Sequence, residues 1–394
     1  MMRIMQLTRR AGCAILALIL TIQASTNLAL AQTYSASPEL RARIASHPHV
    51  RQVADWGSRA DWSPDSKRLL FLSREYGDVF ELDVASGRTR PLTFHFPHDG
   101  FFRAYYLVNG DLLLTAARNH IPGQGDFGRI FESEMWVMKG DLSGPPVPLG
   151  ERNLEGVAVS RNNMRVAWGR PSAPAPARAA DGKSDASYEY LNKHPNQIWT
   201  ADIVASDGPP KLARSRKVLD CGAKSGPLAD IVARAGRRCW MIEPQNFVPA
   251  TDSALTFTLM TVPADKAGAI DINSYMVDLR TGKVSALKVN GSAYAEMEGV
   301  FPDGKSTLVE YYDGPQIRRA TEVIDLWRLA LDGTGKLTRL TTYNAIDPQL
   351  KSNQGVVSPD GRWMAFGVST AEIEKKVPGQ GIGLFVMDLK AAGF

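Results

Sequence analysis

Short runs of alternating hydrophobic and polar residues follow one another along most of the chain, and tight polar turns separate them. The clearest example covers residues 60–93, where LLFLS and VFELDV alternate with a period of two, as half-buried β-strands do. The turn SPDS at 63–66 precedes the first run, and SG at 86–87 follows the second. Proline presets φ for such a turn, and aspartate bonds to the nearby backbone. The segment therefore predicts four short antiparallel strands.

The same unit recurs along the chain. Residues 299–312 (GVFPDGKSTLVEYY) and 355–368 (GVVSPDGRWMAFGV) repeat it most clearly, and residues 105–116, 157–169 and 247–260 repeat it more weakly. Each copy is followed by a strand that contains aromatic residues or methionine, and then by a second turn. A small sheet cannot bury both faces unless it stacks on neighbours. Six such units predict an all-β protein, a six-bladed β-propeller of four-stranded antiparallel blades.

These motifs resemble those of the TolB-like propeller family, which has WD-repeat-like blades. The shared features are the SPDG-type turn, a hydrophobic strand with an aspartate before a glycine turn, and the closing pairs Leu92-Thr93 and Leu340-Thr341. The resemblance covers about residues 55–390 and implies the fold, because unrelated lyase and peptidase propellers carry the same motifs. TolB-type proteins have an α/β domain before the propeller. The segment between Gln32 and the first predicted blade is too short for one, so the resemblance implies a TolB-like propeller without it.

The two ends of the propeller are expected to meet in its last blade. The last repeat supplies three strands before Phe394, and residues 49–55 (HVRQVAD) have strand-like character ahead of the first blade. We expect them to form the outer strand of the last blade. Ser37 as N-cap and Pro38 at the first helical position predict a short helix just before. The expected organisation is an N-terminal extension at 32–48 and a propeller at 49–394.

Residues 1–31 have the three-part layout of a secretory signal peptide. A basic start without acidic residues precedes the apolar run CAILALILTI at 13–22, and Ala29-Leu30-Ala31 places small residues at a cleavage site before Gln32. The run is too short to span a bilayer, which takes about 20 residues. We therefore expect a periplasmic or secreted protein that is soluble after signal cleavage and has no transmembrane segment.

The charge balance argues against a nucleic-acid partner. Lysine and arginine total 46 and aspartate and glutamate total 41, which gives a formal net charge of +5. Removal of Arg3, Arg9 and Arg10 with the leader would leave about +2, whereas nucleic-acid binders usually carry a strongly basic surface.

Export would leave two cysteines, Cys221 and Cys239. An even pair in an oxidising compartment indicates one disulfide, and two buried free thiols are the alternative. A short amphipathic helix is predicted between them, at 226–236 (GPLADIVARAG).

Loops on the two faces of the predicted propeller differ in length. The turns between first and second strands are tight throughout, whereas the loops between second and third strands and between blades include several long ones. The long loops cover 118–133, 170–197, 214–244, 263–273, 311–322 and 369–383. Loops beyond about 12–15 residues are uncommon unless they are functional or disordered. The long-loop face, at the mouth of the central channel, is therefore the predicted binding face.

Histidines suggest one candidate chemistry on this face. The candidate metal ligands are His95, His98, Asp99, His120 and His194, because neutral imidazoles with a carboxylate suit Zn²⁺ or Mn²⁺. The alternative is that they are loop residues that make ordinary hydrogen bonds. If the protein is an enzyme, the candidate catalytic residues are His95, His98, His120 and Arg103.

Carboxylates beside the first strands suggest a second candidate chemistry on this face. Residues expected to point toward the channel are Asp61, Glu155, Glu243, Glu298 and Gln354. Convergent carboxylates serve acid/base catalysis or bind Ca²⁺, and solvated side chains are the alternative. The residues proposed for the binding face are Arg118, Asn119, Tyr190, Gln197, Gln245, Glu298, Tyr311, Tyr312 and Gln354.

Two functions fit these observations. The first is a monomeric TolB-like binding module of the cell envelope, which holds an envelope protein, a peptide or a glycan and requires no cofactor beyond a possible Ca²⁺ or transition metal. The alternative is a polysaccharide lyase or another carbohydrate-active enzyme on the same scaffold. The chain has no Gly-x-Ser-x-Gly elbow, Walker loop or dinucleotide fingerprint. The sequence therefore favours the binding module.

Overall fold

The fold is known from a computed structural model. It describes residues 37–119, 121, 127–178, 186–205, 208–249, 251–264, 270–287, 294–312, 323–376 and 381–394. The predicted signal peptide at 1–31 lies outside them. The chain divides into two units, Met1–Ala42 and Arg43–Phe394. Helix α2 (Pro38–Ala45) begins in the first unit, where the sequence predicted a helix, and the Leu40 N–H donates to Ser37 Oγ at 3.2 Å, which caps it.

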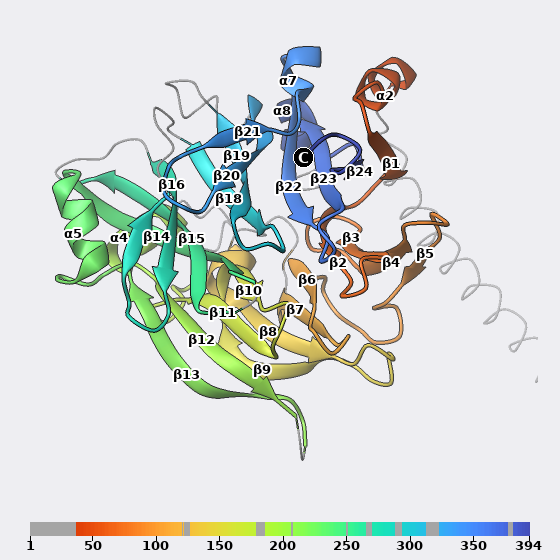
Figure 1. The fold of residues 1–394 in the computed structure, drawn as a ribbon. Coiled ribbons are helices and arrows are strands. Elements are labelled where there is room, and N and C mark those ends of the chain that lie inside the picture. Colours follow the sequence, from red (N-terminus) through yellow and green to blue (C-terminus); the bar gives the residue numbers. More distant parts are fainter. Residues whose placement is uncertain are drawn as a thin grey trace, which may run out of the picture. The chain divides into compact units, whose positions relative to one another are not determined.

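Antiparallel strands build the second unit, which is described by itself from here on (Figure 1). The first sheet contains β2 (Ser58–Trp62), β3 (Arg68–Leu72), β4 (Val79–Asp83) and β5 (Thr89–Pro91). The second contains β6 (Arg103–Tyr106), β7 (Leu112–Ala117), β8 (Ser133–Met138) and β9 (Val147–Arg152). The third contains β10 (Leu154–Val159), β11 (Arg165–Arg170), β12 (Gln197–Val204) and β13 (Lys211–Asp220).

The next sheet has eight strands and consists of two meanders. The first meander contains β14 (Arg237–Phe247), β15 (Ala254–Pro263), β16 (Asp271–Asp278) and β17 (Val284–Ala286). The second contains β18 (Tyr294–Val300), β19 (Ser306–Tyr312), β20 (Asp325–Ala330) and β21 (Leu337–Arg339). A single parallel pair, Ile272 with Tyr294, joins β16 to β18.

The two ends of the unit meet in the last sheet. It contains β22 (Leu350–Val357), β23 (Trp363–Thr370), β24 (Leu384–Asp388) and, as its outer strand, β1 (Val50–Ala54). The register places Gln52 opposite Phe385, and Figure 1 shows β1 beside β24. This is the strand that the sequence predicted at 49–55.

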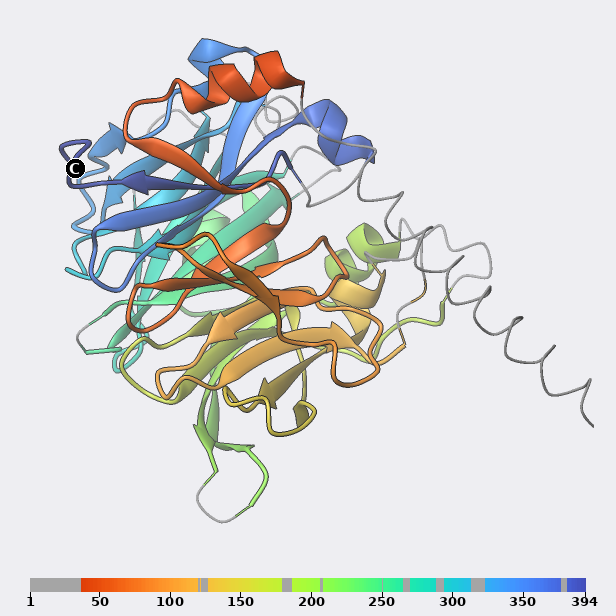
Figure 2. The same ribbon diagram turned by 90° about the vertical axis from the view of Figure 1, so that its right-hand side faces the viewer.

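The first strands of the meanders form a closed ring. β2 contacts β6, β6 contacts β10, β10 contacts β14, β14 contacts β18, β18 contacts β22, and β22 returns to β2. Figure 2 shows the sheets around this ring from a second direction, with the hairpin of β12 and β13 projecting beyond its neighbours. The unit is thus a propeller of antiparallel blades.

Hydrophobic side chains fill the space between neighbouring blades. Leu70 and Leu72 of β3, for example, cluster with Leu112 and Leu114 of β7 in the next blade, and all four are at most 2% exposed. Strands buried on both faces read as continuous apolar runs, which is why LLFL and LLL stand in the sequence at these positions.

The SPD turns have a common hydrogen-bond pattern. Ser63 Oγ donates to Asp65 Oδ1 at 2.5 Å and accepts from the Arg68 N–H at 3.0 Å. Ser358 bonds in the same way to Asp360 and to the Trp363 N–H. Serine and aspartate therefore close the first hairpin of both blades.

The closing Leu-Thr pairs also have a structural role. Thr93 Oγ1 donates to Asp78 at 3.0 Å and accepts from the Val79 N–H at 3.2 Å. Thr341 Oγ1 does the same with Asp325 at 3.0 Å and with the Leu326 N–H at 2.9 Å. The threonine after the fourth strand thereby fixes the start of the third strand in the same blade.

Short helices lie between some of the strands, and α5 (Pro227–Arg234) confirms the predicted helix between the cysteines. The others are a π-helical turn η1 (Gly128–Glu132), α4 (Ala186–Lys193), α7 (Tyr343–Ile346) and α8 (Ala371–Lys376). The loop expected at 214–244 is shorter, because β13 and β14 extend into it from both sides. No helix within the described ranges is long and apolar enough to cross a membrane.

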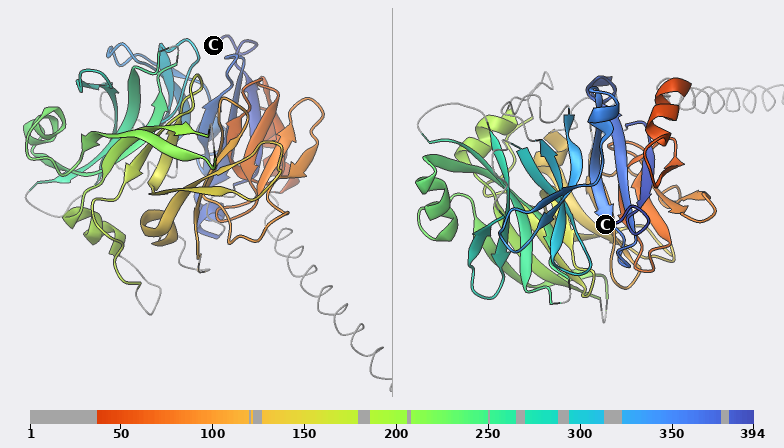
Figure 3. Two further views of the ribbon diagram at one scale, coloured as in Figure 1. Left: turned by 90° about the horizontal axis from the view of Figure 1, so that it is seen from below. Right: turned by 45° about the horizontal axis from the view of Figure 1, so that its top comes forward.

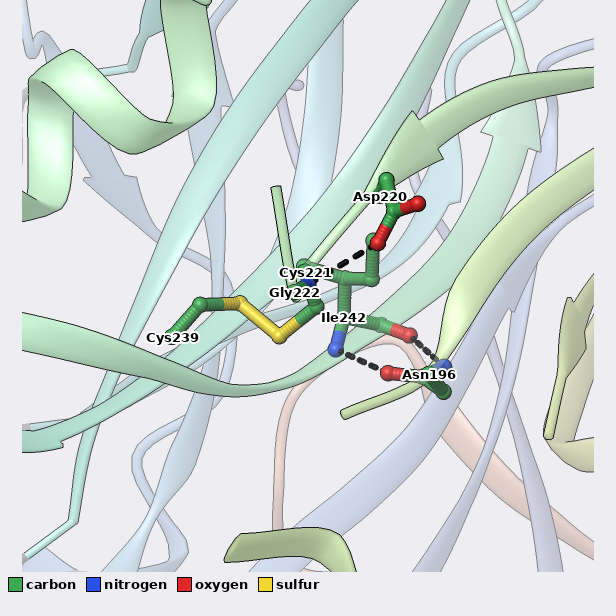
Figure 4. Close-up of a disulfide and its surroundings, with 6 residues drawn as sticks. All are labelled: Asn196, Asp220, Cys221, Gly222, Cys239 and Ile242. Atoms are coloured by element: carbon green, nitrogen blue, oxygen red, sulfur yellow. Dashed lines mark hydrogen bonds between the residues drawn. A yellow bond between two sulfur atoms is a disulfide. The ribbon is translucent and has the colours of Figure 1, made fainter. Parts of the chain in front are cut away.

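The predicted disulfide between Cys221 and Cys239 is confirmed (Figure 4), with a Cα–Cα distance of 5.4 Å. Beside it, the Asn196 side chain accepts from the Ile242 N–H at 2.9 Å and donates to the Ile242 carbonyl at 2.7 Å. Leu228 and Val232 of α5 are buried in the same cluster as both cysteines. Helix α5 thus packs on β14 (Figure 3) as part of the core.

Candidate ligand-binding cavity

The ring of first strands encloses a cavity of about 570 Å³. All six of these strands contribute side chains to its lining. The acidic residues of the lining are Asp61, Glu155, Glu243, Glu296, Glu298 and Glu310. The basic residues of the lining are Arg59, Arg103, Arg129, Arg161 and Lys351. A cavity lined so densely by ionisable groups is the strongest functional candidate among the described residues.

Irregular backbone helps to present these side chains. The register shifts within β2, β10, β14, β18 and β22. At three of these bulges, Arg59, Glu155 and Gln354 have φ angles of 56°, 58° and 55°. Left-handed backbone is costly for residues with a side chain, and bulges of this kind often re-aim a side chain at a functional site.

One wall of the cavity is basic. Arg129 Nη1 donates to Glu155 Oε2 at 3.0 Å, and its Nε lies 3.9 Å from Glu75 Oε1. Arg103 Nη1 donates to the Phe102 carbonyl at 3.1 Å, while its Nη2 lies 4.0 Å from Glu155. Arg59 adds a third guanidinium to this wall. We call Arg59, Arg103 and Arg129 the arginine wall.

The opposite charge gathers on β14, β18 and β19. Glu243 Oε1 accepts the Gly156 N–H at 2.9 Å. Glu310 Oε1 accepts the Gln354 N–H at 2.7 Å, and the Tyr294 hydroxyl donates to Glu296. We call Glu243, Glu296, Glu298 and Glu310 the glutamate wall.

An ion pair links two blades near the tight-turn face. Arg161, in the turn between β10 and β11, donates to both carboxylate oxygens of Asp61 on β2. Asp61 also accepts the Tyr106 N–H at 2.8 Å. The blades of Arg161 and Asp61 are separated by the blade of β6, so the ion pair links two blades that are not neighbours in the ring.

Three carboxyl groups of the glutamate wall have raised pKa values. Burial, reinforced by Glu155 and Glu296, raises the pKa of Glu243 to about 8, although Arg103 acts in the opposite direction. Burial and Glu310 raise the pKa of Glu296 to about 7. Burial and the neighbouring glutamates also raise the pKa of Glu298 well above its ordinary value. Several carboxyl groups packed together cannot all ionise without cost, and each therefore holds its proton more tightly.

Three of these groups form a possible acidic metal site. Carboxylate oxygens of Glu296, Glu298 and Glu310 all lie within 4.8 Å of one another. Hard cations such as Ca²⁺ bind oxygen ligands of this kind, and Mn²⁺ also accepts them.

The predicted histidine ligands lie in different surroundings. His98 Nε2 is 3.1 Å from Asp78 Oδ1, and exposed His95 is 3.4 Å from the Gly144 carbonyl. Asp99 is exposed, and the His194 ring packs against Tyr190 with ring centroids 4.9 Å apart. His120 lies outside the described residues. Of the catalytic candidates within the described ranges, Arg103 lines the cavity, and His95 and His98 are not in its lining.

The expected channel residues do line the cavity: Asp61, Glu155, Glu243, Glu298 and Gln354.

Of the proposed binding-face residues, the lining contains Gln245, Glu298 and Gln354. The other proposed residues are not in the lining. Arg118 pairs with Glu134 at 2.7 Å, Gln197 donates to Asp220 at 3.0 Å, and Tyr190 donates to the Ala173 carbonyl at 2.7 Å. Tyr311 packs between blades, the ring of Tyr312 lies against a small cluster with Tyr294, and Asn119 is exposed.

Sequence reasoning missed Arg59, Glu296 and Glu310. Arg59 and Glu296 each stand two residues before an expected channel residue, so strand alternation could have found them. Glu310 lies on the second strand of its blade, opposite Glu296. Only pairing across the sheet brings it to the channel.

No family model matches the chain, and no curated protein matches it. Solved structures share the propeller fold at low identity. An oligogalacturonate lyase in complex with manganese is 14% identical, with 84% of this chain and 77% of that chain covered and a TM-score of 0.46. A protein assigned to TolB from Agrobacterium tumefaciens is 14% identical, with 80% and 71% covered and a TM-score of 0.34. The calcium-binding protein regucalcin from the same species is 12% identical, with 86% and 92% covered and a TM-score of 0.42. These similarities concern the fold alone.

Proposed function

We propose that this chain is a binding module, an exported six-bladed propeller that holds a small polar ligand in its central cavity. The eight-stranded sheet counts as two blades in this proposal, since a single residue pair joins its two meanders. The disulfide supports export, because such bonds persist mainly in oxidising compartments.

The observation that carries the proposal is the cavity of about 570 Å³ with charged side chains from every first strand. Its volume falls in the range of small-molecule sites, roughly 300–1,000 Å³. Taking charges out of water costs free energy that apolar residues would not cost. Three strained, bulged positions aim polar side chains into the same space. Both costs are typical of positions retained for binding.

The second candidate function is a carbohydrate-active enzyme on the same scaffold. One observation favours it: the pKa of Glu243 is raised to about 8, and the carboxyl groups of Glu155 and Glu296 are close enough to contribute. A carboxylic acid that keeps its proton at neutral pH can act as a general acid.

A cavity-filling variant tests the proposal. Gln245 lines the cavity, and Gln245→Trp would occupy much of its volume. Ile121→Trp introduces the same side chain at a position that is 43% exposed and outside the lining, so it is the matched control. Thermal unfolding would be measured with a panel of polar metabolites, short peptides and oligosaccharides.

We expect at least one compound to raise the Tm of the wild type and of Ile121→Trp but not of folded Gln245→Trp. Equal stabilisation of Gln245→Trp, or no saturable ligand in the panel, would contradict the proposal. Turnover of the bound compound that is lost in Glu243→Gln while binding persists would favour the enzyme.

A further inference from the structure

We infer that the ligand of this cavity is a small zwitterion. Its carboxylate would lie against Arg59 and Arg103 of the arginine wall, and its ammonium group against the glutamate wall. The inference rests on the proposed function, that the cavity holds a ligand, and it adds the chemical class of that ligand.

The arginine wall has unused donors. Arg59 Nε is buried and has no hydrogen-bond partner among the described residues, and the backbone N–H of Arg59 donates to Gln354 Oε1 at 2.9 Å. Glu155, the carboxylate beside Arg103, is bonded to Arg129 at 3.0 Å and lies 4.0 Å from Arg103. Within the described ranges, neither Arg59 nor Arg103 has a carboxylate at hydrogen-bond distance. A guanidinium fork is well matched to a carboxylate, which accepts two parallel hydrogen bonds from it.

The guanidinium groups of the arginine wall also repel one another at Arg59. Burial lowers the pKa of Arg59, and so do Arg103 and Arg129, even though Glu75 and Glu155 act in the opposite direction. Arg59 therefore lies beside two other guanidinium groups, which act against its own positive charge. An incoming anion at Arg59 would offset this repulsion.

The glutamate wall has unused acceptors. The backbone carbonyl of Glu298 accepts from Asn246 Nδ2 at 2.8 Å, but its side chain has no hydrogen-bond donor among the described residues. Glu243 uses Oε1 for the Gly156 N–H, and its other oxygen faces no donor in the described structure. An ammonium group offers three donors, and its positive charge would favour the ionised form of carboxyl groups whose pKa values burial and their neighbours raise.

A ligand with one charge would fit this cavity poorly. Arg59 and Arg103 line the cavity from β2 and β6, whereas Glu243, Glu296 and Glu298 line it from β14 and β18 on another side of the ring. A simple anion at Arg59 would meet the glutamates, and a simple cation would meet the guanidinium groups. The volume of about 570 Å³ also exceeds what a single ion needs. A molecule with opposite charges at its two ends complements both walls.

The test uses 6-aminohexanoate as probe, with hexanoate and hexylamine as matched compounds that carry one charge each and Ca²⁺ as a separate probe. Binding to the full chain would be measured by isothermal titration calorimetry. The variants are Arg59→Gln, Arg59→Lys, Arg103→Gln and Glu298→Gln. Arg88→Gln, an exposed arginine in a turn of the first blade, is the control. Circular dichroism checks that each variant is folded.

We expect 6-aminohexanoate to bind at least tenfold more tightly than hexanoate or hexylamine. Arg59→Gln, Arg103→Gln and Glu298→Gln should each weaken it about tenfold or more, because each removes a charge-assisted hydrogen bond. Arg59→Lys should retain part of the affinity, and Arg88→Gln all of it.

Three results would overturn the inference. The first is that hexylamine or Ca²⁺ binds as tightly as 6-aminohexanoate. The second is that Arg59→Gln folds and binds 6-aminohexanoate as tightly as the wild type does. The third is that 6-aminohexanoate shows no saturable binding. In each case another compound that binds the wild type but not Gln245→Trp would leave the proposed function standing. If no compound bound in the cavity of the wild type, both the inference and the proposed function would be contradicted.

Discussion

Glu243 shows how the channel changes the behaviour of a single residue. It is 7% exposed, bonded to one backbone N–H and close to other carboxyl groups, and its pKa rises to about 8. In the unfolded chain the same group has a pKa near 4.3. The folded state therefore binds this proton more tightly than the unfolded state does.

This difference predicts that Glu243 makes folding stability depend on pH. Its stabilising contribution is complete below about pH 4 and is lost as the pH rises toward 8, because the folded state binds more protons in that window. Glu243→Gln keeps an acceptor for the Gly156 N–H and removes the titration. We expect Glu243→Gln to raise the Tm relative to wild type by a few degrees at pH 9 and by little at pH 5.

Thermal unfolding of both proteins between pH 5 and 9 measures the effect. Asp332, an exposed carboxylate in the turn after β20, offers a control variant, Asp332→Asn. A Tm difference between wild type and Glu243→Gln that stays constant across this range would contradict the prediction.

At the scale of elements, the blades are held by repeated polar clamps as well as by apolar packing. Thr341 is fully buried, and its hydroxyl contacts Asp325, the Leu326 N–H and Ser352. Thr341→Val keeps the shape but leaves these buried groups without a partner. We expect a loss of about 1–3 kcal/mol in the free energy of unfolding.

The control is Thr334→Val, because Thr334 donates to Asp332 at 2.6 Å in an exposed turn. Water replaces that bond, so urea unfolding of Thr334→Val should show a much smaller loss. Equal losses at the two threonines would mean that burial does not matter to the clamp.

The disulfide joins the residue after β13 to the start of β14, and the two cysteines are 18 positions apart in the sequence. Cross-linking a loop of this length stabilises by about 3 kcal/mol in the chain-entropy model. The double variant Cys221→Ser/Cys239→Ser should lose about that much in urea unfolding. Wild type treated with a reductant should match it, and an unchanged unfolding midpoint would contradict the prediction.

At the scale of the whole molecule, the ring is closed by β1, which pairs with β24 although some 330 residues separate partners such as Gln52 and Phe385. Replacing Val50–Ala54 with a Gly-Ser segment of equal length removes this strand. We expect a lower Tm and a broader transition. The same replacement of residues 332–336, an exposed glycine-rich turn, is the control, and equal transitions in the two variants would show that closure adds no stability.

The sequence predicted the strand order, the closing strand, α5 and the disulfide because each leaves a local signal: alternation, a turn motif or a cysteine pair. Five channel residues were also predicted, since each lies in or beside a segment that the repeat marks as a first strand. Glu310 was not, because it reaches the channel only through its pairing with Glu296. The sequence could not place the histidines relative to the cavity, since a position in a long loop does not determine the distance between side chains.

The Arg161–Asp61 ion pair ties the third blade to the first, past the intervening second blade. A motion that spread these blades apart would have to separate this pair, so we expect the three blades to move together as one rigid body.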